Sequence, residues 1–217
     1  MFNTSPPSPI TMLKSGLVSG DAVDKRLAVF SRLGLHPNTL SMMALALALC
    51  GFLALWGDRL FGGFLLFLFS GFMDMVDGAV ARATGQASKV GAFLDGVLDR
   101  YVEGLLILGL MFYLGPEVHF LVPIGIWIVL LVFGSLMTTF VRAYADHRGL
   151  VKDQEILAKK IGGLLERAER LMLLYLGMIG ALIFSETWLV GAIVLAAILS
   201  NLTAIQRILL SIKYGRS

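Results

Sequence analysis

The sequence contains a single cysteine, Cys50, among its 217 residues, and only 15% of the residues are charged. One cysteine cannot form an intramolecular disulfide, which excludes a small fold held together by disulfides. The low charge content excludes an ordinary soluble domain, in which about a quarter of the residues are charged. Hydrophobic residues make up 57% of the chain, and the mean hydropathy is +0.82. These values are typical of a membrane protein with several spans.

Six apolar segments are each long enough to cross a hydrocarbon core about 30 Å thick. The stretch at residues 20–33 places its apolar and charged side chains largely on different sides, which is typical of a helix at a membrane interface. The sequence therefore predicts an all-α membrane protein with an N-terminal amphipathic interfacial helix and six transmembrane helices, all in one domain over residues 1–217. The predicted spans are residues 39–56, 60–83, 91–114, 121–143, 165–185 and 187–210.

Four aspartates interrupt the second and third apolar segments: Asp74, Asp77, Asp95 and Asp99. An ionisable side chain near the centre of a bilayer costs at least about 2.5–3.5 kcal/mol, so such residues indicate function. Spacings of three and four residues place each pair on one face of a helix. An antiparallel hairpin turning at residues 84–89 would bring the two pairs together. A cluster of carboxylates suits Mg²⁺, Mn²⁺ or Ca²⁺ rather than Zn²⁺.

The run from Asp74 to Asp99 resembles the complete signature of the CDP-alcohol phosphotransferases, Asp-x2-Asp-Gly-x2-Ala-Arg-x8-Gly-x3-Asp-x3-Asp, and no position departs from it. The resemblance implies a membrane enzyme that moves a phospho-alcohol from a CDP-activated donor to a second alcohol, with release of CMP. It also implies a divalent metal, Mg²⁺ or Mn²⁺, six transmembrane helices, an amphipathic N-terminal helix and a homodimer. The donor would be CDP-diacylglycerol or an archaeal CDP-ether lipid.

The resemblance also implies a role for each signature residue. Asp74, Asp77 and Asp95 are implied as metal ligands, and Asp99 as the general base that completes the acidic cluster. The residues implied in donor binding are Asp74, Asp77, Gly78, Ala81, Arg82 and Gly91. From the residues alone, the glycines have a second interpretation, because small side chains also let membrane helices pack closely.

Three arginines near the predicted ends of the fourth and fifth spans suggest an acceptor that carries phosphate: Arg142, Arg167 and Arg170. Guanidinium groups match the geometry of phosphate oxygens well. The alternative is that Arg167 and Arg170 pair with Glu166 and Glu169 on the same helix, or contact lipid headgroups. Both interpretations stay open.

The segments 142–144 and 166–170 resemble the branch of the family that uses inositol phosphate. Phe140 departs from that branch, which often has a lysine two residues before the first arginine. Inositol phosphate is therefore the favoured acceptor and glycerol 3-phosphate the alternative.

The basic residues also predict an orientation. Of the eighteen Lys and Arg residues, only Arg59 falls on the far side of a six-span arrangement. The positive-inside rule then places both termini and the mouth of the acidic cluster in the cytoplasm.

A channel or transporter for divalent cations is the alternative from another class, because acids within spans also mark ion pathways. It would need a second acidic layer, and the apolar interiors of the first, fourth, fifth and sixth spans contain none. We expect no nucleic-acid partner.

Overall fold

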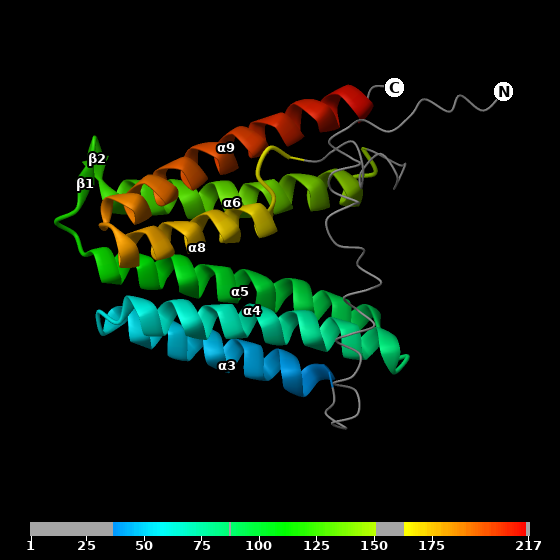
Figure 1. Ribbon diagram of the computed structural model, residues 1–217. Coiled ribbons are helices and arrows are strands. Elements are labelled where there is room, and N and C mark those ends of the chain that lie inside the picture. Colours follow the sequence, from blue (N-terminus) through cyan, green and yellow to red (C-terminus); the bar gives the residue numbers. More distant parts are fainter. Residues whose placement is uncertain (1–36, 87, 151–162, 216–217) are drawn as a thin grey trace, which may run out of the picture. The chain divides into compact units, whose positions relative to one another are not determined.

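A computed structural model describes residues 37–86, 88–150 and 163–215, which form six helices and one short strand pair (Figure 1). The predicted interfacial helix at residues 20–33 lies outside the described residues. The elements are α3 (Pro37–Trp56), α4 (Leu60–Ala83), α5 (Lys89–Leu114), β1 (His119–Phe120), β2 (Val122–Pro123), α6 (Ile124–His147), α8 (Arg167–Ile183) and α9 (Thr187–Gly215).

The predicted spans agree well with the observed helices in the first half of the chain. The start of α6 and the end of α9 differ from the predicted bounds. Helices α3 and α4 cover the first two predicted ranges. Helix α6 begins at Ile124 rather than at residue 121, because β1 and β2 pair across Leu121, whose φ is 62°. Helix α9 continues to Gly215 rather than ending at residue 210, because neither proline nor glycine interrupts it earlier in that last turn.

Four of the described helices, α3, α4, α6 and α9, are long and apolar enough to cross a membrane. Helix α5 has 26 residues, but charged side chains lower its hydropathy. Helix α8 has 17 residues, which corresponds to about 26 Å of helix and is slightly less than a hydrocarbon core of about 30 Å. The fold is thus that of a helical membrane protein, and the crossing of the membrane by α5 and α8 stays a prediction.

The chain divides into two compact units. The first contains Met1–Leu47 and Leu68–Tyr101, and the second contains Ala48–Phe67 and Val102–Ser217. Helices α3, α4 and α5 therefore each contribute one end to each unit.

In the first unit, the start of α3 packs on the end of α4. Leu40, Val76 and Val80 form a small apolar core, and the hydroxyl of Ser70 donates a hydrogen bond of 2.7 Å to the carbonyl oxygen of Ala44. A buried hydroxyl needs such a partner, because an unsatisfied one is costly. This packing fixes the part of α4 that carries the first two aspartates.

The connection between α4 and α5 is short because both helix ends carry strong capping signals. Gly85 has a φ of 68°, and the N–H of Gln86 donates to the carbonyl oxygen of Ala81 at 3.0 Å, which is the usual glycine-terminated helix end. The hydroxyl of Ser88 accepts a hydrogen bond of 3.0 Å from the N–H of Gly91 and caps the start of α5. These caps confirm the predicted turn between the two pairs of acids.

In the second unit, α9 packs against both α6 and α8 (Figure 1). Two glycines allow this close approach. A Cβ atom on Gly134 would lie 2.9 Å from the backbone nitrogen of Asn201, and one on Gly177 would lie 2.5 Å from the Cβ of Ala192. The buried core of the unit includes Leu55, Phe67, Leu110, Leu131, Leu174 and Ile193.

Candidate active site

Three of the four predicted acids meet in the first unit. Asp74 comes from α4, and Asp95 and Asp99 come from α5. One carboxylate oxygen from each lies within 4.8 Å of the others. Asp74 and Asp99 are half-buried, and Asp95 is exposed. The helical spacing of the acids and the short capped turn between α4 and α5 together produce this cluster.

The cluster has the charge and the donor atoms that a divalent cation requires. Two like charges 4.8 Å apart repel by about 3.5 kcal/mol at an effective dielectric constant of about 20, before screening by water at the exposed side. A bound divalent cation would replace this repulsion by attraction. The three ligands offer oxygen only, which suits Mg²⁺ or Mn²⁺. The residues therefore fit a divalent metal.

The fourth acid, Asp77, is not one of the three whose oxygens lie within 4.8 Å of one another. The residue is only 5% exposed, and its Oδ2 accepts a hydrogen bond of 2.6 Å from the hydroxyl of Ser41 on α3. A buried carboxylate needs such a donor. Its role as a metal ligand stays a prediction. Sequence reasoning missed Ser41, whose only signal was a hydroxyl within an otherwise apolar helix.

The residues implied in donor binding lie in the same unit as the acids. A Cβ atom on Gly78 would lie 3.2 Å from Nη1 of Arg82, so the glycine leaves room for that guanidinium group. Arg82 is exposed, whereas Ala81 and Gly91 are half-buried. Nucleotide contact by this set stays a prediction.

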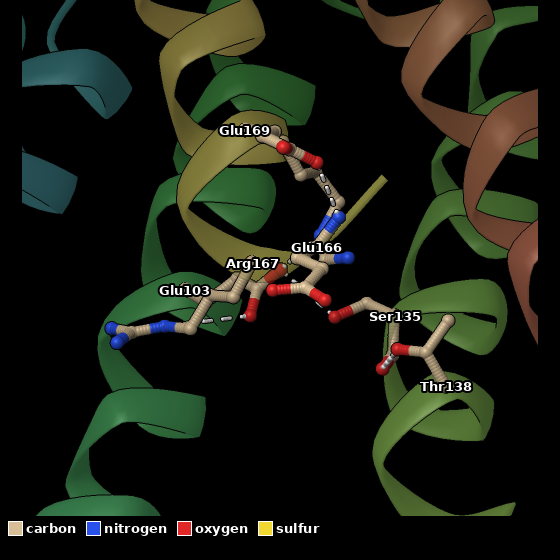
Figure 2. A network of polar contacts seen from close by, with 7 residues as sticks. Glu103, Ser135, Thr138, Glu166, Arg167 and Glu169 are labelled. Carbon is tan, nitrogen blue, oxygen red and sulfur yellow. Dashed lines mark hydrogen bonds and ion pairs between the residues drawn. The ribbon is translucent and has the colours of Figure 1, made fainter. Parts of the chain in front are cut away.

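Two of the three predicted acceptor arginines lie beside one buried carboxylate in the second unit, that of Glu103, and Figure 2 shows Arg167 next to it. Nε of Arg170 donates a hydrogen bond of 2.6 Å to Oε1 of Glu103. Nε of Arg167 lies 4.0 Å from Oε2 of the same residue. The side chain of Arg170 is 1% exposed and that of Arg167 is 25% exposed. Arg142 is exposed near the end of α6.

The acids of α8 have contacts of their own. Glu169 accepts a hydrogen bond of 3.0 Å from the N–H of Glu166, and the two side chains form a capping box at the start of α8. Oε1 of Glu166 also lies 3.9 Å from Nη2 of Arg207 on α9. Arg170 therefore pairs with α5 rather than with an acid of its own helix, which corrects that part of the alternative interpretation.

Sequence reasoning missed Glu103, Ser135 and Arg207, which belong to this network. Glu103 is 2% exposed and accepts a hydrogen bond of 2.8 Å from the hydroxyl of Ser135 on α6. Arg207 is 7% exposed, and its Nη1 donates a hydrogen bond of 2.7 Å to the carbonyl oxygen of Thr138. Charged residues within apolar helices were the available signal.

A sequence model of the CDP-alcohol phosphatidyltransferase family matches residues 34–206. The chain belongs to this family. It is therefore a transferase of phosphate-containing groups and an integral membrane protein of phospholipid synthesis, which decides against the channel alternative.

Relatives of this CDP-alcohol phosphatidyltransferase include synthases of phosphatidylinositol phosphate and archaetidylinositol phosphate. It is 32% identical over 202 residues to the phosphatidylinositol phosphate synthase of Mycobacteroides abscessus, covering 89% of this chain and 86% of the relative. It is 28% identical over 181 residues to the archaetidylinositol phosphate synthase of Methanothermobacter thermautotrophicus, covering 83% of this chain and 85% of the relative.

Crystal structures of the phosphatidylinositol phosphate synthase of Mycobacterium tuberculosis have the same fold as this phosphatidyltransferase. The structure with CDP-DAG bound has a TM-score of 0.73 and 26% identity, covering 87% of this chain and 92% of that chain. The complex with manganese and citrate has a TM-score of 0.73 and 27% identity, covering 87% of this chain and 88% of that chain.

Proposed function

We propose that this phosphatidyltransferase transfers a phosphatidyl-type group from a CDP-lipid to inositol phosphate and releases CMP. The observation that carries the proposal is the meeting of the Asp74, Asp95 and Asp99 oxygens within 4.8 Å of one another, in a chain that belongs to the family. The phosphatidylinositol phosphate and archaetidylinositol phosphate synthases among its relatives support the choice of acceptor. The donor is CDP-diacylglycerol or an ether-lipid analogue.

The aspartates hold the reacting groups at the site. Asp74, Asp77 and Asp95, together with Asp99, would bind one divalent cation, Mg²⁺ or Mn²⁺. Such a cation neutralises the diphosphate of the donor and the charge that develops on the leaving group. The hydrogen bond from Ser41 orients Asp77, as outer partners of metal ligands commonly do.

Asp99 acts as the general base. Its carboxylate takes the proton from the acceptor hydroxyl, and the resulting oxygen attacks the phosphorus atom that carries the lipid. The bond between that phosphorus and the bridging oxygen breaks, and CMP leaves with the bridging oxygen. The rate of such a transfer depends mainly on positioning and electrostatic stabilisation. A rigid cluster on two helices provides that positioning.

The remaining residues bind the two substrates. Gly78, Ala81, Arg82 and Gly91 contact the CMP part of the donor, and Arg142, Arg167 and Arg170 bind the phosphate of the acceptor. Arg167 makes the more direct contact, because its side chain is partly exposed whereas that of Arg170 is buried.

We also propose that the six predicted spans all cross the membrane, that both termini and the site face the cytoplasm, and that the enzyme is a homodimer. The asymmetric distribution of Lys and Arg residues supports the orientation. The dimer has its support in the family resemblance.

A panel of labelled acceptors tests the proposed function. Purified full-length protein is incubated with CDP-diacylglycerol or its ether analogue, Mg²⁺, and inositol phosphate, glycerol 3-phosphate, serine or inositol. We expect a labelled lipid with inositol phosphate and release of an equal amount of CMP. Preferential labelling by glycerol 3-phosphate would establish the alternative acceptor. No CMP release with any donor and acceptor would contradict the proposal.

A further inference from the structure

Glu103 joins three helices of the second unit through a single buried carboxylate (Figure 2). Its Oε1 accepts hydrogen bonds from Nε of Arg170 on α8 at 2.6 Å and from the hydroxyl of Ser135 on α6 at 2.8 Å. Its Oε2 faces Nε of Arg167 at 4.0 Å. With 2% exposure, Glu103 has no bulk water to replace these partners, and a buried carboxylate is tolerated only when it is paired.

One carboxylate therefore hydrogen-bonds one guanidinium group and lies near a second. In both arginines Nε is the nitrogen of the contact with Glu103, at 2.6 Å for Arg170 and 4.0 Å for Arg167. Nη1 of Arg170 is buried and makes no hydrogen bond within the part of the chain that the structure describes. A buried charged donor without an acceptor is costly, so this nitrogen needs an acceptor that the described residues do not supply. A phosphate oxygen matches a guanidinium donor in charge and geometry.

We propose that Glu103 is a positioning residue for acceptor binding, which rests on the proposed function. Glu103, held by Ser135, orients the guanidinium groups of Arg167 and Arg170 so that they bind the phosphate of the acceptor alcohol. Glu103 itself touches no substrate. The site therefore selects a phosphorylated acceptor over the same alcohol without phosphate. A salt bridge that only held the helices together would contribute equally to both substrates.

Steady-state kinetics of the full-length protein, with CDP-lipid and acceptor varied separately, distinguish these roles. The variants are Glu103→Gln, which keeps the size and an acceptor for Ser135 but removes the charge, and Ser135→Ala. We expect Glu103→Gln to raise the acceptor KM about tenfold or more, with the KM for CDP-lipid within about twofold of the wild type. Ser135→Ala removes one hydrogen bond and should raise the acceptor KM about threefold.

Glu186→Gln is the matched control, because it makes the same change in the turn before α9, at an exposed residue whose carboxylate lies 3.4 Å from the hydroxyl of Tyr113. We expect its kinetics to match the wild type. A second readout is competition by inorganic phosphate against the acceptor, which should weaken in Glu103→Gln by about the same factor as the KM rises.

Unchanged acceptor KM in both variants, or an equal rise in the KM for both substrates, would overturn the inference. If Glu103→Gln does not fold, Ser135→Ala alone decides between these outcomes. The proposed function fails separately: a wild type that uses no phosphorylated alcohol contradicts it, whereas an active wild type with unaltered variants contradicts only the role of Glu103.

Discussion

The two units each contain a group of charged side chains among apolar helices, and the two groups are built in opposite ways. The cluster of Asp74, Asp95 and Asp99 brings like charges together, with Asp95 exposed. The Glu103 network brings opposite charges together and buries them. Like charges at this distance favour the binding of a cation, whereas opposite charges stabilise each other. The acidic cluster is therefore suited to binding a cation, whereas the Glu103 network is held mainly by ion pairs between its own side chains.

The largest effect expected is on catalysis at the like-charged cluster. Asp99→Asn keeps the shape of the side chain but removes the base, so the transfer rate should fall by about 10²–10⁴-fold. The measurement is CMP release from CDP-lipid. Asp58→Asn is the matched control, because Asp58 lies in the turn between α3 and α4 with a φ of 58°, a conformation that asparagine also adopts. Near-normal turnover of Asp99→Asn would remove Asp99 from its proposed role.

The opposite-charge network should respond most strongly in stability. Glu103→Leu leaves the buried Arg170 without its counterion, and we expect a loss of about 3–5 kcal/mol in the free energy of unfolding. Adding Arg170→Leu removes the uncompensated charge and should restore most of that loss. Thermal unfolding in detergent measures both. If the double variant is no more stable than Glu103→Leu, the uncompensated charge of Arg170 is not the cause of the lost stability.

Removing one charge from the acidic cluster should not lower the stability of the metal-free protein, in contrast to the Glu103 network. Without divalent cation, Asp95→Asn relieves repulsion and should unfold at the same temperature as the wild type or higher. With Mn²⁺ at a hundredfold excess over its dissociation constant, the wild type should gain about 2.7 kcal/mol and Asp95→Asn much less. Asp58→Asn should retain the full gain. An equal Mn²⁺ effect in Asp95→Asn and wild type would place the ion elsewhere.

The smallest expected effect concerns Ser41, which donates a hydrogen bond to Asp77. Ser41→Ala removes the 2.6 Å hydrogen bond to Asp77 and should weaken Mn²⁺ binding about tenfold, as outer-shell changes at metal sites commonly do. Titration of the purified protein with Mn²⁺ measures the affinity directly. Ser70→Ala is the control, because its hydroxyl bonds a backbone carbonyl instead. Identical affinities would leave Ser41 with a purely structural role.

The acidic cluster could be predicted from the sequence because its determinants are local. Spacings of three and four residues and a capped turn after Gly85 decide how α4 and α5 present their acids. The contacts that surround it are not local. Ser41 meets Asp77 across 36 residues, and Glu103 meets Arg170 across 67. No periodicity predicts such partners, since they depend on which helices pack together.

The partners of the arginines could not be predicted for the same reason. Their charge and place near the helix ends indicated a phosphate site, but burial of Arg170 depends on the packing of α8, and the sequence offered acids on the same helix as equally good partners. The late start of α6 has a similar origin, because the pairing of His119 with Pro123 is a tertiary feature of a short loop.

The charges on α5 also have a consequence for how the chain enters the membrane. Lys89, Asp95, Asp99, Arg100 and Glu103 all lie on this one helix, which would partition poorly into lipid by itself. Its tight connection to the strongly apolar α4 would let the two helices insert together as one hairpin. The charges proposed for catalysis would then make the insertion of α5 depend on α4.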